Sequence, residues 1–494
     1  MRHFSMMGGC VLALTAVALL PFSSAAPLQW EQVQPVGEGP TARYSHGSST
    51  CDAMQGAFFI FGGEDGSTLY SDTWFFDPSS AGWEEVQFVA PRLPGQCAID
   101  TAPVLVPQAR AGHSMASTGN LTVMCGGYTF RNSSTKIYAK SADPVVANVP
   151  GGAIDCWWLI PTPEPMWKKF KYAINGSTPI PSPREGFALE WDSMERSLLI
   201  FGGLNSTGGM LNDCFYLEVP EWDLDAPDKA HIWRSCRPAD EGVVAATEPA
   251  PRYGHGSSFF TGAGDESMYI FGGFANNGVG VVAQPDMWKL TTHHVATDAR
   301  WIEINPVSTG PSARGFHAFW RSGDKFVIHG GQGNEGTGRS SVLQDTWSYD
   351  LFTGVWKQYG SSDSIPVASN IAVAPLDAST AVAHGGIGAS GGPTGGLFKF
   401  NIRSGWTSVL PAGQRPSRRA GHVAVLDDST SRMLVSFGIT TGPKLIGDSW
   451  ILNLETLKWE CLHGPGESCE GPLVPPPRGP GPLAFMTGIN HGGR

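Results

Sequence analysis

Charged residues are scarce in this sequence, and several familiar patterns are missing from it. Only 16% of the 494 residues are charged, and no long stretch has the apolar spacing of an amphipathic helix. There is no Walker loop, His-Glu-x-x-His or dinucleotide fingerprint, so the enzyme classes that depend on those motifs are not indicated. The net charge of −11 argues against nucleic acid and anionic membrane surfaces as partners.

Glycine, proline and tryptophan are abundant instead. The chain has 63 glycines, 38 prolines and 17 tryptophans. Glycine and proline interrupt strands at turns, and aromatic side chains are enriched in sheets. This composition predicts an all-β protein with many turns. The length exceeds what one core usually needs, so it fits several domains or one large repeat array.

The first residues have the order of a secretory signal peptide. A basic start is followed by an apolar run at 11–20 and by small residues at 23–26. We predict a signal peptide at 1–25, cleaved near Ala25 or Ala26, and a secreted product. An uncleaved anchor is the alternative, but the run is too short to favour a span. No later segment is apolar enough to cross a membrane, so none is expected in the mature chain.

Cysteines and sequons fit a secreted chain. Removing Cys10 with the signal leaves an even number of cysteines, which suggests disulfides. The eight are Cys51, Cys97, Cys125, Cys156, Cys214, Cys236, Cys461 and Cys469. Closeness in the repeat suggests Cys214–Cys236 and Cys461–Cys469, with buried free thiols as the alternative. No pair has the spacing of a zinc site. Glycosylation sequons occur at Asn120, Asn132, Asn175 and Asn205.

Glycine pairs recur along the chain. They lie at 62–63, 126–127, 202–203, 272–273, 330–331, 385–386 and 492–493, with a degenerate "FGI" at 437–439. The spacing indicates a repeat of roughly 50 residues that insertions have stretched.

Three further signals keep phase with the glycines. An arginine precedes each pair except 385–386, at Arg43, Arg110, Arg184, Arg252, Arg314, Arg419 and Arg478. Three residues later most repeats have a histidine, at His46, His113, His255, His317 and His422. After the glycines comes Asp-x-aromatic, at Asp72, Asp155, Asp213, Asp286, Asp345 and Asp448. A lone tryptophan then follows, at Trp83, Trp167, Trp233, Trp301, Trp356, Trp406 and Trp459.

With these four signals the repeat resembles the kelch repeat over nearly all of residues 28–494. The resemblance implies a β-propeller whose blades are four-stranded antiparallel sheets around a channel. The expected blades lie near 43–88, 110–172, 184–236, 252–305, 314–360, 366–410 and 419–462. The sixth is the weakest, because it keeps only "HGG" and Trp406. Each sheet alone could not bury both faces, whereas stacking against like sheets does.

The two ends of the chain predict a partial eighth blade. Residues 478–494 resemble the first two strands of a repeat and end in "HGGR", whereas Trp30, within 28–34, resembles a last strand. We therefore expect seven complete blades plus a partial eighth formed by the termini. Closure with seven blades and truncation after Gly493 are the alternatives.

Alternating strand direction places the arginine, the loop after Gly-Gly and the aspartate on one face, which we call the top face. Most insertions lie there, in loops at 128–154, 274–285 and 332–344 and in links at 89–108, 237–250 and 463–477, whereas 218–231 lies at the bottom. Elaborated loops usually carry function. Glycans at Asn132, Asn175 and Asn205 would crowd blades 2 and 3. They would leave blades 4–7 to a protein partner.

The arginines and histidines each have two interpretations. The seven arginines could form a cationic ring that binds acidic groups at the channel mouth. Alternatively, each serves its own repeat, which we favour because nearly every repeat has one. The histidines could bind metal, but residues on separate inner strands around a ring seldom converge on one ion. We interpret them as structural histidines with satisfied hydrogen bonds.

The function we predict is a secreted or lumenal interaction module that binds a protein or glycan through the top face, with no cofactor and no catalytic residue. An enzyme with a channel-mouth site is the alternative, because enzymes occur on kelch-like propellers. However, the copper-radical oxidases need two Tyr and two His at the copper ion. This chain has only 10 tyrosines and no obvious extra domain that could supply the remaining parts of such a site. The nitrile-specifier motif Glu-x3-Asp-x3-His has Lys229 in place of its histidine. A fragment of a larger attractin-like ectodomain is the third alternative.

Overall fold

The computed structural model describes most of the region between residues 39 and 463. The described ranges are 39–51, 57–77, 82–88, 105–119, 121–131, 135–161, 165–173, 179–219, 230–236, 248–262, 264–292, 299–334, 340–360, 369–411, 414–427, 432–442, 444–454 and 458–463. Within these ranges the structure is almost entirely β, with one short 3-10 helix at Pro144–Val146. None of the described residues forms a helix long and apolar enough to cross a membrane.

The described residues form seven sheets of four main antiparallel strands, and each sheet comes from one continuous stretch of the chain in which short extra strands can intervene. The inner strands are β1 (Gly47–Cys51), β5 (Ala111–Ser117), β11 (Ala188–Asp192), β17 (Gly256–Gly262), β23 (Ala318–Ser322), β29 (Ala372–Pro375) and β33 (Val423–Asp427). The second strands are β2 (Ala57–Phe61), β6 (Thr122–Arg131), β12 (Ser197–Phe201), β18 (Asp265–Phe271), β24 (Lys325–His329), β30 (Thr380–His384) and β34 (Arg432–Ser436).

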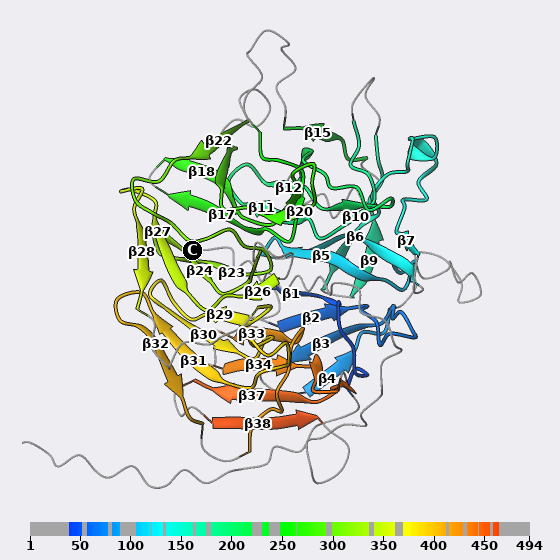
Figure 1. The fold of residues 1–494 in the computed structure, drawn as a ribbon. Coiled ribbons are helices and arrows are strands. Elements are labelled where there is room, and N and C mark those ends of the chain that lie inside the picture. Colours follow the sequence, from blue (N-terminus) through cyan, green and yellow to red (C-terminus); the bar gives the residue numbers. More distant parts are fainter. Residues whose placement is uncertain are drawn as a thin grey trace, which may run out of the picture.

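The third strands carry the aromatic residues after the aspartate. They are β3 (Thr73–Asp77), β8 (Cys156–Ile160), β14 (Cys214–Glu218), β21 (Met287–Thr291), β27 (Thr346–Asp350), β31 (Leu397–Asn401) and β37 (Ser449–Asn453). The outer strands are β4 (Gly82–Glu85), β9 (Met166–Lys169), β15 (Trp233–Ser235), β22 (Arg300–Ile304), β28 (Trp356–Tyr359), β32 (Gly405–Val409) and β38 (Lys458–His463). The seven sheets follow one another around a central channel, which confirms the predicted propeller architecture (Figure 1).

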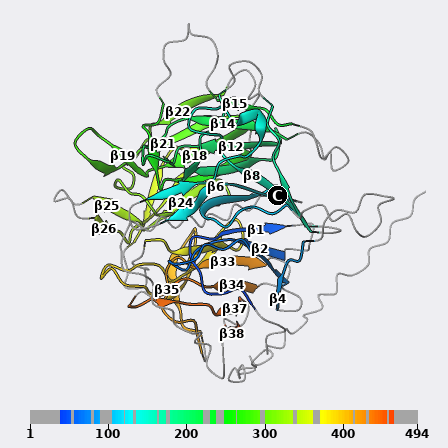
Figure 2. The same ribbon diagram turned by 90° about the vertical axis from the view of Figure 1, so that its right-hand side faces the viewer.

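Short strands form an extra layer above the sheets. They are β7 (Lys136–Tyr138), β10 (Arg184–Glu185), β13 (Leu204–Asn205), β16 (Arg252–Tyr253), β19 (Phe274–Asn276), β20 (Val281–Ala283), β25 (Gln332–Asn334), β26 (Ser340–Val342), β35 (Ile439–Thr440) and β36 (Lys444–Leu445). Figure 2 shows β19, β25, β26 and β35 projecting from the same side. They follow the glycine pairs, so this side is the predicted top face.

The core lies between sheets, where aromatic and aliphatic side chains of adjacent blades interdigitate. One cluster joins blades 2 and 3, and another joins blades 3 and 4. Some outer-strand tryptophans also form hydrogen bonds across the interface. Nε1 of Trp167 donates to Oγ1 of Thr73 in the preceding blade at 2.9 Å, and Nε1 of Trp406 donates likewise to Thr346 at 2.7 Å. A buried indole N–H thereby keeps a partner while its ring fills the interface.

The seventh sheet packs directly on the first. Nε1 of Trp83 donates to Oγ of Ser449 at 3.0 Å, in the same way as Trp167 and Trp406 contact their preceding blades. Side chains of β2, β3 and β4 share one hydrophobic cluster with those of β33, β34 and β37. An intervening eighth blade would have to separate these contacting side chains. The predicted eighth blade between sheets seven and one is therefore wrong; its residues, 28–34 and 478–494, lie outside the described residues.

The seventh repeat has a different register from the one we predicted. The amide of Phe437 donates to the carbonyl of Asp448, as the amide of Gly62 does to Asp72. Phe437 therefore takes the place of the first glycine, and Gly438 that of the second. Phe437 has a φ of 63°, like the glycine it replaces. Its ring contacts the rings of His46 and Trp83, so it fills the interface where the ring closes.

Candidate binding face and central channel

The repeat arginines are buried inside their own blades. Arg252 donates from Nη1 and Nη2 to the two carboxylate oxygens of Asp286, both at 2.7 Å, and from Nη1 to the carbonyl of Gly272 at 2.8 Å. Its Nε donates to the carbonyl of Ala250. The same aspartate accepts from Nε1 of Trp288 at 2.6 Å, which explains the Asp-x-Trp spacing.

The other described arginines repeat this arrangement. The pairs are Arg43–Asp72, Arg110–Asp155, Arg184–Asp213, Arg314–Asp345 and Arg419–Asp448. All six arginines are fully buried, so a ligand at the channel mouth cannot reach their guanidinium groups. The cationic-ring interpretation is therefore wrong for these six, and the alternative, that each serves its own blade, holds. Arg478 lies outside the described residues.

Blade 6 shows what replaces the pair when the arginine is missing. Thr394 Oγ1 donates to the carbonyl of Gly385 at 2.6 Å. This is the carbonyl of the first glycine, which the arginine satisfies in the other blades. The hydroxyl of Thr394 thus satisfies the same carbonyl without a buried charge.

The repeat histidines lie in the interfaces between blades. The ring of His255 meets Phe201 of the preceding blade edge-on with 5.4 Å between centroids, and His317 meets Phe271 in the same way. Burial, with a smaller contribution from the nearby arginines, lowers the pKa of His46, His255, His317 and His422 to about 3. Their structural role agrees with our interpretation.

The predicted hydrogen bonds are absent for three of the five, although Nε2 of His422 lies 3.3 Å from Nδ1 of His384. Both ring nitrogens of His46, His255 and His317 are buried without a partner. Among the described residues no group of three or more His, Cys, Asp or Glu is arranged to hold a metal ion.

Two disulfides are present in the described residues. Cys214–Cys236 links β14 to the end of β15, as predicted, and Cys125–Cys156 links β6 to β8. Cys97, Cys469 and the side chains of Cys51 and Cys461 lie outside the described residues.

Of the sequons, Asn120, Asn132 and Asn175 also lie outside. Oδ1 of Asn205 accepts hydrogen bonds from the amides of Thr207 and Gly209 in a top-face turn.

Two buried glutamates, which sequence analysis missed, brace the top hairpin of blade 2. Glu64 of blade 1 accepts from the hydroxyl of Tyr128 at 2.7 Å and from Nη1 of Arg131 at 2.6 Å. Burial, reinforced by Glu64, raises the pKa of Tyr128. The carboxylate of one blade therefore holds the hairpin of the next.

Glu185 of blade 3 holds the other side of this hairpin. It accepts from the hydroxyl of Tyr138 and from Nζ of Lys136, both at 2.7 Å. Glu64 directly follows a glycine pair and Glu185 directly follows a repeat arginine, so alignment of the repeats could have marked both positions. Beyond the brace, Phe130 and Ile137 form an exposed cross-strand pair.

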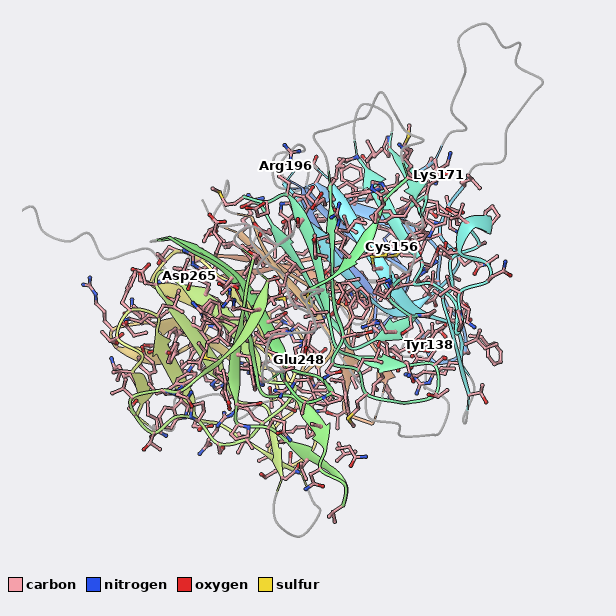
Figure 3. All side chains as sticks on the ribbon, turned by 90° about the horizontal axis from the view of Figure 1, so that it is seen from above. Tyr138, Cys156, Lys171, Arg196, Glu248 and Asp265 are labelled. Carbon is pink, nitrogen blue, oxygen red and sulfur yellow. A yellow bond between two sulfur atoms is a disulfide. The ribbon has the colours of Figure 1, made fainter. Side chains whose placement is uncertain are left out.

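Blade 4 carries the tallest hairpin in the described residues, built on the three-stranded sheet β16-β19-β20. At its tip Val279 is 96% exposed and Val281 is 49% exposed. At its base the rings of Tyr253, Phe274 and Phe316 contact one another with centroids 5.4–6.0 Å apart. The hairpin β25-β26 of blade 5 lies beside β20. In Figure 3 Tyr138 and Glu248 lie on the side of these hairpins, and Arg196 lies on the opposite side.

The central channel contains a cavity of about 140 Å³ between the inner strands. Its wall includes Ser48, Ser114, Glu190, Ser257, Phe316 and Trp320. Among the described residues of this wall Glu190 is the one carboxylate, and its Oε1 accepts from the hydroxyl of Ser257 at 2.5 Å. Sequence analysis missed Glu190 as well, although it is an acidic residue within an inner strand.

Comparison with known proteins agrees with this architecture. Residues 150–386 match the model of the KLHDC2/KLHL20/DRC7 Kelch-repeats domain. Acyl-CoA-binding domain-containing protein 4 of Arabidopsis thaliana is 24% identical over 343 residues, which cover 69% of this chain and 42% of that protein. Host cell factor 2 of Homo sapiens is 23% identical over 354 residues, which cover 65% of this chain and 38% of that protein. The chain thus spans less than half the length of these relatives.

A solved structure titled "Structure of YjhT" aligns with a TM-score of 0.46 and 13% sequence identity. The alignment covers 72% of this chain and 97% of that one.

Proposed function

We propose that this chain, which is a kelch-repeat β-propeller protein, is a secreted interaction module that binds a protein or glycan partner through its top face. The observation that carries this proposal is the raised hairpin of blade 4, whose tip exposes Val279 and Val281. Exposed apolar side chains gathered on an elaborated loop are typical of interaction sites.

The base of this hairpin supports a preformed binding surface. β19 pairs with β16 on one side and β20 on the other, and the aromatic group of Tyr253, Phe274 and Phe316 packs beneath it. A rigid hairpin loses little conformational entropy on binding, so more of the contact energy becomes affinity.

Blades 4 and 5 are a better site for a protein partner than blade 2. The exposed pair Phe130 and Ile137 stands beside the sequon at Asn132, and Asn205 lies on the adjacent blade. Glycans at these sequons would shield that sector, whereas the sequence has no sequon in the 274–285 and 332–344 loops.

Secretion is the second part of the proposal. The signal-like N-terminus supports it, and so do the two disulfides, because disulfides persist in oxidising compartments. Expressed in a eukaryotic cell, the full chain should appear in the medium and lose mass on N-glycosidase treatment. Asn205→Gln should remove one glycan. An unglycosylated product retained in the cytosol would contradict secretion.

Binding is tested with the secreted protein applied to cells from its own source. A Val279→Asp/Val281→Asp variant should lose at least tenfold in surface binding, whereas Phe352→Asp, at an exposed turn between β27 and β28, should bind normally. Unchanged binding of the Val variant, or after alanine substitutions throughout 274–285 and 332–344, would contradict the assigned face.

A further inference from the structure

In blade 7 a residue with a Cβ, Phe437, takes the place of the first glycine of the pair. In blades 1, 2, 3, 4 and 6 this glycine faces the carbonyl oxygen of the repeat arginine in the next blade, and a Cβ added to it would lie only 2.3–2.9 Å from that oxygen. Such a separation is shorter than the van der Waals contact between a carbon and an oxygen atom. The blade that follows blade 7 around the ring is blade 1. Because of Phe437, blade 1 cannot approach blade 7 as closely as the other blades approach their predecessors.

The backbone hydrogen bonds across this interface differ accordingly. At four other interfaces the amide of the second glycine donates to the arginine carbonyl of the next blade, as Gly273 does to Arg314 at 2.8 Å. The arginine amide donates back to a carbonyl of the preceding blade. Between blades 7 and 1 the equivalent groups belong to Gly438, Arg43 and Ile446. Among the described residues, no backbone hydrogen bond joins these two blades.

The aromatic packing of the interface is retained. In blades 1, 3 and 4 the residue before the glycine pair is a phenylalanine whose ring contacts the histidine of the next blade, as Phe271 contacts His317. In blade 7 that position is Ser436, and the ring of Phe437 contacts His46 instead, with 5.3 Å between centroids. The order Phe-Gly-Gly is therefore replaced by Ser-Phe-Gly. This change keeps an aromatic ring between the blades but loses the glycine that allows close approach.

In the described part of the chain, side chains alone thus hold blade 7 against blade 1. They are the hydrophobic cluster that β2, β3 and β4 share with β33, β34 and β37, the contacts of Ala42 and Tyr44 with Leu445, and the bond from Trp83 to Ser449. Apolar contacts are non-directional, whereas a hydrogen bond requires a fixed distance and angle. We call this interface the seam.

We propose that the seam is a conformational device: the ring opens there while its other interfaces stay closed, which widens the central channel. Proteins open locally where fewer interactions resist the opening, and the closed and open rings are two states in equilibrium. Blade 4 lies across the ring from the seam (Figure 1), so the opened ring keeps the blade 4 hairpin intact. The proposal is therefore independent of the proposed function.

Two adjacent residues of β33 provide matched probes of opening. Val425 packs in the seam and Ala424 packs against blade 6, and both are 3% exposed. Val425→Cys and Ala424→Cys variants of the full chain are incubated with N-ethylmaleimide under native conditions, and peptide mass spectrometry follows labelling at each position. The thiol at position 425 should react at least tenfold faster than the thiol at position 424. Equal rates would overturn the proposal, because global unfolding exposes both positions alike.

Restoring the repeat should close the seam. Ser436→Phe/Phe437→Gly recreates the Phe-Gly-Gly order of blades 1, 3 and 4. In the Val425→Cys background this double substitution should slow labelling at least tenfold. If it slowed labelling equally at positions 424 and 425, the effect would be global stabilisation and would contradict a local seam.

A disulfide across the seam provides a second test if the restored variant fails to fold. A Cβ added to Gly447 would lie 3.2 Å from the Cβ of Ala42 in blade 1, close to the Cβ–Cβ separation of about 3.5–4.5 Å found in disulfides. With Ala42→Cys/Gly447→Cys oxidised, labelling at position 425 should again slow at least tenfold. Ala42→Ser/Gly447→Ser, which cannot form the bond, should label like its parent. Undiminished labelling in both the restored and the disulfide variants would overturn the seam.

Discussion

At the residue scale, the arginine of each repeat joins strands of its own blade. Its side chain crosses from the start of the inner strand to the aspartate before the third strand and to the carbonyl of the first glycine. In four blades its own carbonyl also accepts from the second glycine of the preceding blade, as Arg314 does from Gly273 at 2.8 Å. One residue therefore links the blade internally and to its neighbour, which explains why arginine and Gly-Gly recur together.

Breaking one of these pairs should be strongly destabilising. Asp448→Asn leaves Arg419 fully buried without its counter-charge, and the expected loss in unfolding free energy is about 3–5 kcal/mol. Urea denaturation measures the loss. Glu85→Gln, on the exposed side of an outer strand, should change stability by less than about 0.5 kcal/mol. A loss of under about 1 kcal/mol for Asp448→Asn would argue against the structural role of the pair.

The buried histidines predict a particular pH dependence. Their pKa is about 3 in the folded protein and about 6.5 in the unfolded chain, so the unfolded state binds more protons between these values. The stability they contribute is therefore complete above pH 6.5 and declines as pH falls toward 3.

Blade 3 supplies the substitution that tests this, because Phe187 stands where five other blades have histidine. His255→Phe should remove one titrating group and keep the packing. Between pH 6.5 and 5 the variant should lose about 2 kcal/mol less unfolding free energy than the wild type. Urea denaturation at the two pH values measures the difference, and parallel losses would show that His255 is not protonated on unfolding.

At the scale of the element, each glycine pair ends the second strand where the next blade approaches. A Cβ on Gly272 would lie 2.3 Å from the carbonyl oxygen of Arg314, and the residue has a φ of 66°. Another residue can adopt the positive φ at some cost, as Phe437 shows. However, no residue with a Cβ can be accommodated this close to the carbonyl oxygen of Arg314.

A pair of alanine substitutions separates these two effects. Gly272→Ala has both the strained φ and the clash, whereas Gly278→Ala in the exposed hairpin has a φ of 87° and open space around it. Gly278→Ala should cost about 1–2 kcal/mol locally. Gly272→Ala should cost several kcal/mol or prevent folding, as thermal denaturation would show. Equal costs would mean that the clash is relieved by movement of the blades.

The braced hairpin of blade 2 gives a second prediction at this scale. Glu64→Gln weakens the hydrogen bonds that hold Tyr128 and Arg131, so amide exchange in β6 beyond Gly127 and in β7 should accelerate severalfold. Exchange in the β19-β20 hairpin is the internal control and should not change. Uniform acceleration across the molecule would indicate global destabilisation instead of a local brace.

At the scale of the whole molecule, the repeats could be predicted from the sequence because the same residue types make the same local contacts in each copy. The top face followed from phase and strand direction, the propeller architecture from the resemblance to the kelch repeat, and the Cys214–Cys236 disulfide from closeness in the repeat. Closure did not follow, because the pattern contains no information on which sheet packs on the first. The ends suggested an eighth blade, but Trp83 contacts Ser449 as Trp167 and Trp406 contact the preceding blade.

The candidate sites were harder to predict for a related reason. A repeat pattern identifies the residues that recur from copy to copy, and these residues stabilise the blades, as the buried arginines show. Glu64, Glu185 and Glu190 each occur in one copy only. Such departures from the repeat are where this molecule differs from a generic propeller, and they lie in the hairpin brace and the channel.

The most direct test of the top-face assignment is site-specific photo-crosslinking of the secreted protein. A benzophenone amino acid is placed at Val279, at Ile137 or at Phe352, which are all exposed apolar positions. The account predicts a cross-linked partner, identified by mass spectrometry, at position 279 and none at position 352 on the opposite face. Partner cross-links from 352 with none from 279 would contradict the top-face assignment, and cross-links from 137 alone would move the site to blade 2.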